Sequence, residues 1–593
     1  MKGYGGDLLR VDLSTGELKR EPIDAEFYKS YLGGRGFCAR LAWDEIPAGA
    51  DPLGPENRII IGVGPLSGLP VPGAGRSHFA AKSPATGGYG DSSMGGKFGP
   101  ELKYAGIDCI VIKGKSPKPV YLLIEDDHVE LKDASELWGK GCFATEDALK
   151  EQYGKEYQMA VIGPAGENLV NFAGINHDFG RQAARTGIGA VWGSKGLKAI
   201  AVHGTKKVEL ADPEGFTKTC AAMYQQREDD GIEGWQELGT WAGYAKGNGR
   251  KTLPTRNFNH GVYEKDYTMG PDILKEKYFV GYRACTACPM ACGNYTYSPK
   301  YDVYLEGPEY ETQALVGTDC ALESADDLIY INYLCDDLGM DTISAGNVIA
   351  FTMECAQNGL IDDPVIKNMT FGDAKTAIEL TKMMAYRQGV GDLMAEGVTK
   401  AARKLGGGSE RYAMAVKGLE ISGYESRCYI GMLLAYMTCD VGATHTKAWM
   451  VPEDLEIGPS VDTDEKINAV IYKQHRDPLF DMLGLCQFQL NSLELYSEAL
   501  KTATGIELSP EELLKRSEKC WNLTRMFWKR EVPGFDRKMD LAPGRWADPN
   551  DVGLPVISVE YQNELLDKYY RLRGWDKDGI PTKEKLAELD LVL

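Results

Sequence analysis

The chain has 593 residues, 43% of them hydrophobic, and a formal net charge of -20 at pH 7. This length allows a large buried core, divided into about three domains of roughly 150 to 200 residues each. The negative charge argues against a general nucleic-acid binder, because binding to a phosphate backbone depends on clustered Lys and Arg.

The start of the chain, MKGYGGDLLRVDL, shows neither a secretory signal nor a transit segment. The longest apolar stretches, such as Arg58 to Val63 and Cys109 to Ile112, are far shorter than the roughly 18 residues of a membrane-spanning helix. We therefore expect a cytoplasmic protein without a membrane span. In a reducing compartment its 14 cysteines would stay available to metals as thiols or thiolates.

A β-hairpin is the first predicted element. Leu8 to Leu13 alternates apolar and polar residues, Ser14-Thr15-Gly16 supplies a turn, and Glu17 to Glu21 continues extended. Further predicted strands are separated by glycine-rich loops: Arg58 to Val63, Cys109 to Lys113, Val120 to Ile124, Gln158 to Ile162 and Leu197 to Val202. We assign residues 1–210 to an N-terminal α+β domain.

Helices dominate from Asp212 onward, which is placed to cap the first of them. Ser324 predicts the start of a helix that ends at Gly339, and a second helix is expected from Ser344 to Asn358. We place a further boundary near Gly418, which gives helical domains at 211–417 and 418–593. The sequence shows no repeat of fixed period.

Three cysteines, Cys285, Cys288 and Cys292, form a CxxCxxxC run. This spacing lets one loop bring three thiolates to one metal cluster, and a four-iron cubane is the favoured interpretation. Structural zinc and buried, unligated thiols are the alternatives. A cubane needs a fourth ligand, and spacing alone does not select it among the other cysteines.

Two segments, Asp336 to Asp341 and Asp481 to Cys486, share the form Asp-x-x-Gly-aliphatic, and each closes a predicted helix. The glycine would let the backbone approach a flat ligand closely, and the aspartate could accept hydrogen bonds from ring N–H groups. The same segments are also typical of ordinary helix C-caps.

Three loops combine glycine with arginine or serine: Gly73 to Arg76, Ser92 to Gly96 and Arg181 to Gly189. Free backbone N–H groups and guanidinium groups suit phosphate. None is a Walker A loop or a complete dinucleotide fingerprint, and each could be an ordinary set of turns.

Glu311 and His445 are candidate acid–base groups. Taken alone, a glutamate is usually solvated and a histidine is usually structural, so spacing does not select them.

Together these segments resemble the tungsten-containing aldehyde:ferredoxin oxidoreductase family, from the first strand to the last helix. Other stretches that carry the resemblance are GPLSG at Gly64, ELKYAG at Glu101, GPAGEN at Gly163, GIGAVWGSKGLKAIAV at Gly187 and YYRLRGWDKDGIPTKEKL at Tyr569. The implied fold is α+β: a strand-rich N-terminal domain, which cradles the pterin phosphates, followed by two mainly helical domains. The cofactor would be buried at the interface of the three domains.

By position, the resemblance implies that Cys285, Cys288 and Cys292 hold a 4Fe-4S cluster with Cys486 as the fourth ligand. Two pterin molecules would supply four sulfurs to one tungsten, and the pterin-contacting positions are Asp336, Met340, Asp341, Asp481 and Leu485. The positions that hold the pterin phosphates and a bridging magnesium are Arg76, Ser93, Gly95, Arg181, Gln182 and Ala184, with Lys447 nearby. Cys486 would contact both cofactors.

The resemblance also places Glu311 and His445 beside the metal. A glutamate there can deprotonate water or the aldehyde hydrate, and a histidine can donate to the carbonyl oxygen as negative charge develops. We therefore expect oxidation of a small aldehyde to its acid, with electrons passed to ferredoxin or to a small iron-sulfur subunit. The alternatives are an acyl-CoA or arene reductase on the same scaffold, and a non-catalytic iron-sulfur electron-transfer subunit. An oligomer is compatible with the sequence.

The chain departs from the family pattern at three places. The Glu-x-x-His that bridges subunits through an iron in some members reads Tyr330-Ile331-Asn332-Tyr333, so we expect neither that iron nor that dimer. Ser93 stands where close relatives have a pterin-contacting Asn. Cys320 lies near the expected active site and is either a tungsten ligand, a substrate-pocket residue or, more simply, a small core thiol.

Overall fold

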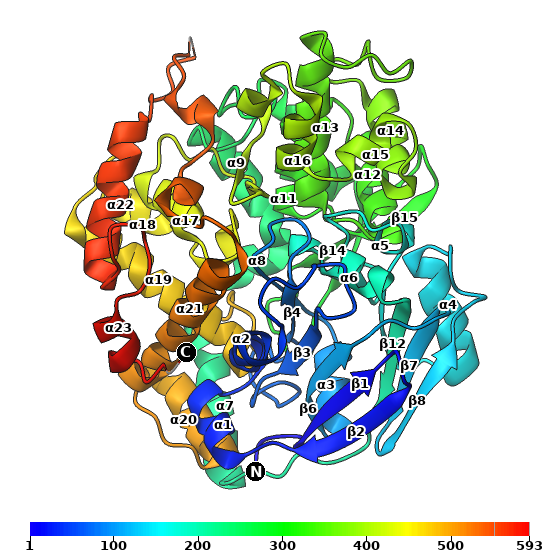
Figure 1. Cartoon of the computed structure of the whole chain (residues 1–593), viewed down its shortest axis with the longest axis vertical. Coiled ribbons are helices and arrows are strands. Elements are labelled where there is room, and N and C mark those ends of the chain that lie inside the picture. Colours follow the sequence, from blue (N-terminus) through cyan, green and yellow to red (C-terminus); the bar gives the residue numbers. More distant parts are fainter. Residues whose placement is uncertain (551, 592) are drawn as a thin grey trace.

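The structure is a computed structural model that describes residues 1–550, 552–591 and 593 (Figure 1). Strands fill the first part of the chain and helices dominate the rest, so the predicted α+β class is confirmed. We keep 1–210, 211–417 and 418–593 as a proposed division of the chain. Every helix in the described ranges is too short or too polar to cross a bilayer.

The first part of the chain contains two six-stranded sheets. The first sheet has the order β2-β1-β6-β3-β4-β5. Its strands are β1 (Asp7–Asp12), β2 (Glu17–Pro22), β3 (Ile59–Val63), β4 (Ser77–Lys82), β5 (Tyr89–Met94) and β6 (Ile107–Lys113). The second sheet has the order β11-β10-β9-β12-β7-β8. Its strands are β7 (Val120–Glu125), β8 (His128–Asp133), β9 (Gln158–Val161), β10 (Ile175–His177), β11 (Arg181–Ala183) and β12 (Leu197–His203).

The two sheets repeat one topology. Each begins with a hairpin, continues through three antiparallel strands and a helix, and ends with a strand parallel to the first, as in β1 with β6 and β7 with β12. The helices that precede the last strands are α3 (Phe98–Tyr104) and α6 (Ile188–Ser194). The connections differ in length, which explains why the sequence shows no fixed period.

Alternating side chains place these sheets face to face. Leu9, Ile61 and Ile110 of the first sheet share one core with Leu122 and Ile200 of the second, as expected for strands whose side chains point to opposite faces in turn. The outer face of the first sheet packs against α2 (Gly34–Glu45), and that of the second against α4 (Cys142–Tyr153). The layers are therefore helix, sheet, sheet and helix.

Helices and one small sheet form the middle of the chain. The helices are α7 (Pro213–Asp229), α8 (Glu233–Leu238), α9 (Ala242–Gly249), α10 (Pro271–Ile273), α11 (Tyr310–Thr312), α12 (Ala325–Leu338), α13 (Thr342–Gln357), α14 (Ala374–Tyr386), α15 (Val390–Met394) and α16 (Val398–Leu405). The antiparallel sheet consists of β13 (Phe279–Arg283), β14 (Gly293–Ser298) and β15 (Val303–Glu306). The loop between β13 and β14 carries the CxxCxxxC run.

Two of the predicted helix starts are confirmed and one is wrong. The Asp212 carboxylate caps α7 by accepting from the Gly215 amide, and the Ser324 hydroxyl caps α12. The helix expected from Ser344 begins at Thr342 instead. Asp341 is its cap, because that carboxylate accepts from the amides of two residues in the first turn at 3.1 Å each.

The last part of the chain is helical and returns to the first part. Its elements are β16 (Ala415–Val416), β17 (Leu419–Glu420), α17 (Ile430–Thr438), α18 (Val451–Ile457), α19 (Asp464–Leu483), α20 (Leu493–Thr504), α21 (Pro510–Glu531), α22 (Val559–Arg573) and α23 (Lys583–Glu588). Helices α19 and α21 contact α2, as Figure 1 shows for α21. The last part of the chain therefore packs directly against the first part.

Candidate functional site

A cavity of about 330 Å³ lies where the three parts of the chain meet. Of the predicted site residues, only Met340, Leu485 and His445 do not line it. The predicted residues that line it are Arg76, Ser93, Gly95, Arg181, Gln182, Ala184, Cys285, Cys288, Cys292, Glu311, Asp336, Asp341, Lys447, Asp481 and Cys486. The fold thus brings together groups that are hundreds of residues apart in the sequence.

The four predicted cluster cysteines face the same cavity. Cys285, Cys288 and Cys292 come from the β13–β14 loop, and Cys486 follows the end of α19. The Cys486 amide donates to the Gly73 carbonyl at 3.1 Å, which joins this segment to the first part of the chain. All four thiols are partly exposed, whereas nine of the other ten cysteines are buried, so these four side chains reach free space.

Cations and amides surround these thiols. Arg76 Nη2 lies 3.3 Å from Cys486 Sγ, and Gln489 Nε2 lies 3.4 Å from Cys288 Sγ. Within the described part of the chain, no group of three or more His, Cys, Asp or Glu side chains is placed to hold a single metal ion. A zinc ion would require sulfurs at about 2.3 Å from one centre. In the described residues the four thiols thus face a shared cavity and do not form a ready-made single-ion site.

Glycine is required where the loops of the first sheet approach the thiols. A Cβ atom on Gly95 would lie 2.9 Å from Cys285 Sγ, and one on Gly75 would lie 3.2 Å from Cys285 Cβ. A Cβ on Gly73 would lie 3.1 Å from Cys486 Cβ. Because these contacts are shorter than ordinary van der Waals contacts, a larger residue at Gly95 would move the sulfur or the loop.

The two Asp-x-x-Gly segments end their helices with the same hydrogen bonds. The Gly339 and Met340 amides both donate to the Cys335 carbonyl, at 2.9 and 2.7 Å. The Gly484 and Leu485 amides both donate to the Phe480 carbonyl. Both glycines are left-handed, with φ near +80°. The segments are thus C-caps in geometry, and each also turns its aspartate toward the cavity.

Each helix end is pressed against one of the two repeated sheets. A Cβ on Gly64, which follows β3, would lie 2.1 Å from the carbonyl carbon of Leu483. A Cβ on Gly163, near the end of β9, would lie 2.4 Å from that of Leu338. Met340 and Leu485 are fully buried in these two seams, which explains why neither side chain lines the cavity.

The two cavity aspartates have different partners. Asp336 accepts hydrogen bonds from two amides, Gln182 Nε2 at 2.6 Å and Asn332 Nδ2 at 2.9 Å. Asp481 accepts from the Ser93 hydroxyl and pairs with Lys447 Nζ at 3.0 Å. Burial raises the pKa of Asp336 well above its ordinary value. Burial would also raise the pKa of Asp481, but Lys447, His78 and Ser93 together lower it.

Several buried polar atoms of residues that line the cavity make no hydrogen bond within the described part of the chain. Within the described ranges, Arg181 Nε, Gln182 Oε1 and Gln489 Oε1 have no hydrogen-bond partner. Buried polar groups are normally hydrogen-bonded, so such atoms indicate a bound polar group. The donor set, with Arg76 and Arg181 beside glycine-rich loops, fits anionic groups such as phosphates.

Glu311 and His445 form a buried pair. Glu311 lies in α11 and its Oε1 is 3.1 Å from His445 Nδ1, while its Oε2 accepts from the Gly423 amide at 2.6 Å. Burial raises the pKa of Glu311 to about 7, although Gly423 and Arg185 act in the opposite direction. Burial also lowers the pKa of His445 to about 3, so the imidazole is neutral. The pair suits proton transfer near neutral pH.

Aromatic side chains enclose this pair. The Tyr424 ring lies 5.8 Å from that of His445, 5.1 Å from that of Tyr310 and 6.4 Å from that of Trp449. The Tyr310 hydroxyl donates to the Gly423 carbonyl at 2.6 Å, which fixes the loop that bonds to Glu311. This apolar wall is the source of the desolvation that shifts both pKa values.

The positions where the chain departs from its resemblance have defined environments. Cys320 is fully buried, and its thiol donates to the Leu315 and Gly346 carbonyls at 3.3 and 3.5 Å. Since it does not line the cavity, it is a core thiol in this structure. Tyr330 stacks on Tyr301 with ring centroids 4.1 Å apart, whereas Asn332 faces the cavity.

Sequence reasoning missed several residues that line the cavity. The main ones are Asp91, Arg185, Glu306, Glu309, Asn332, Gln487, Phe488 and Gln489. Arg185 lies within a loop that was singled out, and Asn332 lies within the segment that lacks the bridging histidine. Asp91 sits in a glycine- and serine-rich strand, and no spacing signal marks it.

Family models match nearly the whole chain. The model described as aldehyde ferredoxin oxidoreductase, N-terminal domain, matches residues 8–204, and the one for domains 2 and 3 matches residues 218–591. The tungsten-containing aldehyde ferredoxin oxidoreductase of Thermococcus kodakarensis is 39% identical over 606 residues, covering 100% of this chain and 99% of the relative. That of Pyrococcus furiosus is 38% identical, with the same coverage.

More distant relatives act on other compounds. The WOR-like subunit of the aliphatic sulfonate oxidoreductase of Pyrococcus furiosus is 30% identical and is covered over 97% of its length by 100% of this chain. A solved structure, the active-site complex BamBC of benzoyl coenzyme A reductase with 1,5-dienoyl-CoA, matches with a TM-score of 0.87 and 29% identity. It is covered over 97% of its length by 100% of this chain.

Proposed function

The chain belongs to the aldehyde ferredoxin oxidoreductase family, and we propose that it oxidises aldehydes to carboxylic acids at a bis-pterin tungsten centre. The electrons pass through a 4Fe-4S cluster to ferredoxin or to a small iron-sulfur subunit. The observation that supports this proposal is one cavity lined by four thiols, two C-cap aspartates and Glu311, which pairs with His445. We also propose a cytoplasmic location, because the cluster thiols must stay reduced.

The residues of the cavity fit these groups. The four partly exposed thiols suit an iron-sulfur cluster, with Cys486 joining it to the pterin side of the cavity. Asp336 and Asp481 offer acceptors to ring N–H groups, and Met340 and Leu485 fill the seams behind them. Asp341 would also contact a pterin. The pterin phosphates and their bridging magnesium would be held by Arg76, Ser93, Gly95, Arg181, Gln182 and Ala184, with Lys447 nearby.

When bound, the tungsten-pterin and the cluster supply a two-electron oxidation and single-electron relay, and the protein supplies the proton chemistry. One aldehyde and one water give one carboxylic acid, two protons and two electrons. Glu311 removes a proton from water or from the aldehyde hydrate, and its pKa of about 7 keeps enough carboxylate present at neutral pH. Neutral His445 carries a single N–H, and with that proton on Nε2 it can donate to the substrate oxygen while Nδ1 faces Glu311.

A second candidate is reduction of an acyl-CoA or arene, which the likeness to the BamBC complex favours. The aldehyde relatives are closer in sequence, at 39% identity against 29% for BamBC. A non-catalytic electron-transfer subunit would need the cluster thiols alone. In such a subunit the buried Glu311–His445 pair, and Asp336 and Asp481 at the cavity, would have no ligand or substrate to act on.

Anaerobic purification followed by metal analysis and dye-linked turnover tests these proposals. We expect about one tungsten and four irons per chain, in accord with one mononuclear centre and one cubane, and turnover on a panel of small aldehydes. Turnover on benzoyl-CoA without aldehyde oxidation would favour the second candidate. Iron without tungsten or molybdenum would leave only the electron-transfer subunit.

A further inference from the structure

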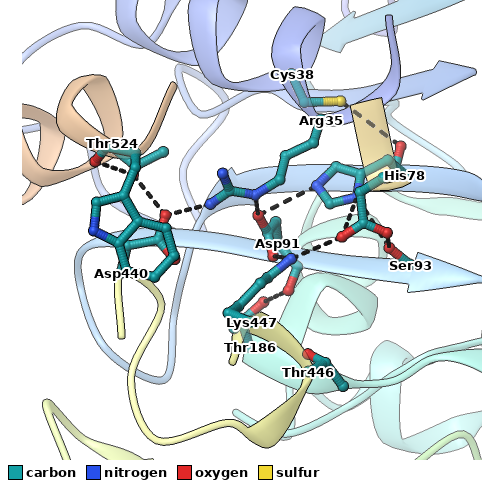
Figure 2. A network of polar contacts seen from close by, with 12 residues as sticks. Arg35, Cys38, His78, Asp91, Ser93, Thr186, Asp440, Thr446, Lys447 and Thr524 are labelled. Carbon is teal, nitrogen blue, oxygen red and sulfur yellow. Dashed lines mark hydrogen bonds and ion pairs between the residues drawn. The ribbon is translucent and has the colours of Figure 1, made fainter. Parts of the chain in front are cut away.

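A chain of buried charges runs from the cavity to the helices of the first and last parts of the protein (Figure 2). We call it the Asp91 charge chain. Its members are Arg35 in α2, Asp91 in β5, Asp481 in α19, and Asp440 and Lys447, which lie between α17 and α18. Three of them, Asp91, Lys447 and Asp481, line the cavity. Arg35 and Asp440 lie behind them.

The contacts of the Asp91 charge chain alternate in sign. Lys447 Nζ lies 3.0 Å from Asp481 Oδ2 and 3.0 Å from Asp91 Oδ1. Arg35 Nε donates to Asp91 Oδ2 at 2.8 Å, and Arg35 Nη2 pairs with Asp440. Asp91 therefore lies between two cations, one facing the cavity and one facing away from it.

Other polar side chains contact both ends of the Asp91 charge chain. His78 Nε2 lies 3.2 Å from Asp91 Oδ2, and its Nδ1 lies 3.1 Å from the Ser93 hydroxyl, which bonds to Asp481. At the far end, the Thr524 hydroxyl donates to Asp440 Oδ2 at 2.6 Å. Because Thr524 belongs to α21, the chain joins the cavity to a helix that packs against α2.

Burial shows which member is available to a ligand. The side chains of Arg35 and Asp91 are 0% exposed, and that of Asp440 is 1% exposed. The side chain of Asp481 is 16% exposed, and it faces the cavity. Asp481 is thus the carboxylate of the Asp91 charge chain that is most open to the cavity. A ring N–H group entering the cavity would meet it there.

Asp336, at the helix end that packs against the second sheet, has different partners from Asp481. Asp336 ends α12 as Asp481 ends α19, but its partners are the amides of Gln182 and Asn332 rather than a lysine. The repeated fold therefore offers one cradle made of charges and one made of amides. This difference comes from the residues and not from the topology.

We propose that Asp91 is a positioning residue, which holds Lys447 against Asp481 and is itself fixed by Arg35 and Asp440. The Asp91 charge chain thus gives the proposed pterin site at Asp481 charged partners that the site at Asp336 lacks. It also links the site at Asp481 to the packing of α2 against α21. The inference rests on the proposed function, because the ligand of the cradle is the pterin. Asp91 touches Lys447 rather than the aldehyde, so it acts on the cofactor and not on substrate binding.

Asp91→Asn in the holoenzyme tests this role, with Asp540→Asn as a matched control. Asp540 is also a fully buried aspartate between an arginine and a lysine, with Arg525 Nη1 at 2.9 Å and Lys417 Nζ at 2.5 Å, but it does not line the cavity. Tungsten and pterin per folded chain, the melting temperature, and kcat and KM for an aldehyde are measured for both variants.

We expect both variants to lose thermal stability, but only Asp91→Asn to lose tungsten and pterin or to show kcat per tungsten about tenfold lower, with KM within about twofold. Equal cofactor content and equal kcat in the two variants would reduce Asp91 to a structural role and overturn the inference. If Asp91→Asn yields no folded chain, Asp440→Asn serves the same comparison, since it disturbs Arg35 without altering a cavity residue. A wild-type protein without tungsten and pterin would instead overturn the proposed function.

Discussion

Glu311 acquires its chemistry from its surroundings. Its carboxylate accepts one backbone hydrogen bond and contacts a neutral imidazole, while the Tyr424 ring packs beside that imidazole and against Tyr310. A base works best when its pKa lies near the operating pH, and burial brings the pKa of Glu311 to about 7. At the residue scale, the proposed reaction depends on this shift.

Replacing Glu311 with glutamine removes the base and keeps the shape of the side chain. We expect Glu311→Gln to retain tungsten and iron and to lose aldehyde turnover by about 100-fold or more, the usual effect of losing a general base. Glu354→Gln is the control, because Glu354 is also buried but pairs with Arg545 and Asn257 away from the cavity. Wild-type turnover in Glu311→Gln would remove Glu311 from the mechanism.

The pH profile reports the same group. Only the ionised carboxylate can accept a proton, so kcat/KM should rise about tenfold per pH unit below pH 7 and become constant above it. The rise should disappear in Glu311→Gln. A wild-type profile that is flat between pH 5 and about 8 would show that another group limits the reaction.

Burial of Glu311 also has a cost in the cofactor-free protein. Its native pKa of about 7 lies above the ordinary 4.5, so between these values the native chain binds more protons than the unfolded chain. Stability contributed by this site therefore falls as pH rises from 4.5 to 7, by up to about 3 kcal/mol. Glu311→Gln should then unfold at higher denaturant than the wild type at pH 8, and the difference should shrink at pH 5. An equal difference at both pH values would contradict the shift.

The residue types at the site were predictable, but their pairing was not. Glu311 and His445 carry no local signal that one will contact the other, since a buried contact between distant segments is set by the fold. Asp91 was missed because a strand aspartate among glycines and serines is usually a turn or surface residue. Asn332 was noticed only for what it replaces, and its bond to Asp336 became visible in three dimensions.

At the scale of secondary-structure elements, the ends of α12 and α19 place Asp336 and Asp481 at the cavity. Each ends at a left-handed glycine and is seated on a glycine of one repeated sheet. The sequence revealed both segments, because a helix C-cap has local chemistry that spacing can detect. Their convergence could not be derived, because it depends on the matching topology of two sheets whose sequences share no fixed period.

Alanine at either seat should displace the helix end that rests on it. Gly64→Ala and Gly163→Ala would place Cβ atoms 2.1 and 2.4 Å from backbone carbons of α19 and α12. We expect each to destabilise the protein by about 3 kcal/mol, the upper range for overpacking. Gly544→Ala is the control, since its Cβ would meet no atom within 4 Å. Denaturant unfolding of the three variants checks this, and equal stability for all three would contradict the seam.

Some strands could be predicted from the sequence and others could not. The five interior strands predicted from apolar runs exist within about two residues of the predicted bounds. The strands β4, β5, β10 and β11 were not predicted, because they are short or rich in Ser, Gly and charged residues. They supply Ser93 and Gln182 to the cavity, so strands that the apolar pattern does not reveal carry part of the site.

At the scale of the whole molecule, the cavity is fixed because one hydrophobic core extends from the first part of the chain to the last. A contiguous core of this kind keeps packed elements from moving independently. The four thiols and Glu311 are thereby held around the same cavity. Under the proposed function, this arrangement would let electrons pass from the aldehyde to the cluster inside one chain.

Low-temperature EPR of the anaerobic holoenzyme, frozen after mixing with an aldehyde in the absence of ferredoxin, tests that claim most directly. Aldehyde alone should produce the signal of a reduced 4Fe-4S cluster in the wild type. In Glu311→Gln the aldehyde should produce no such signal, while dithionite should still reduce the cluster. A wild-type cluster that dithionite reduces but no aldehyde reduces would contradict the account.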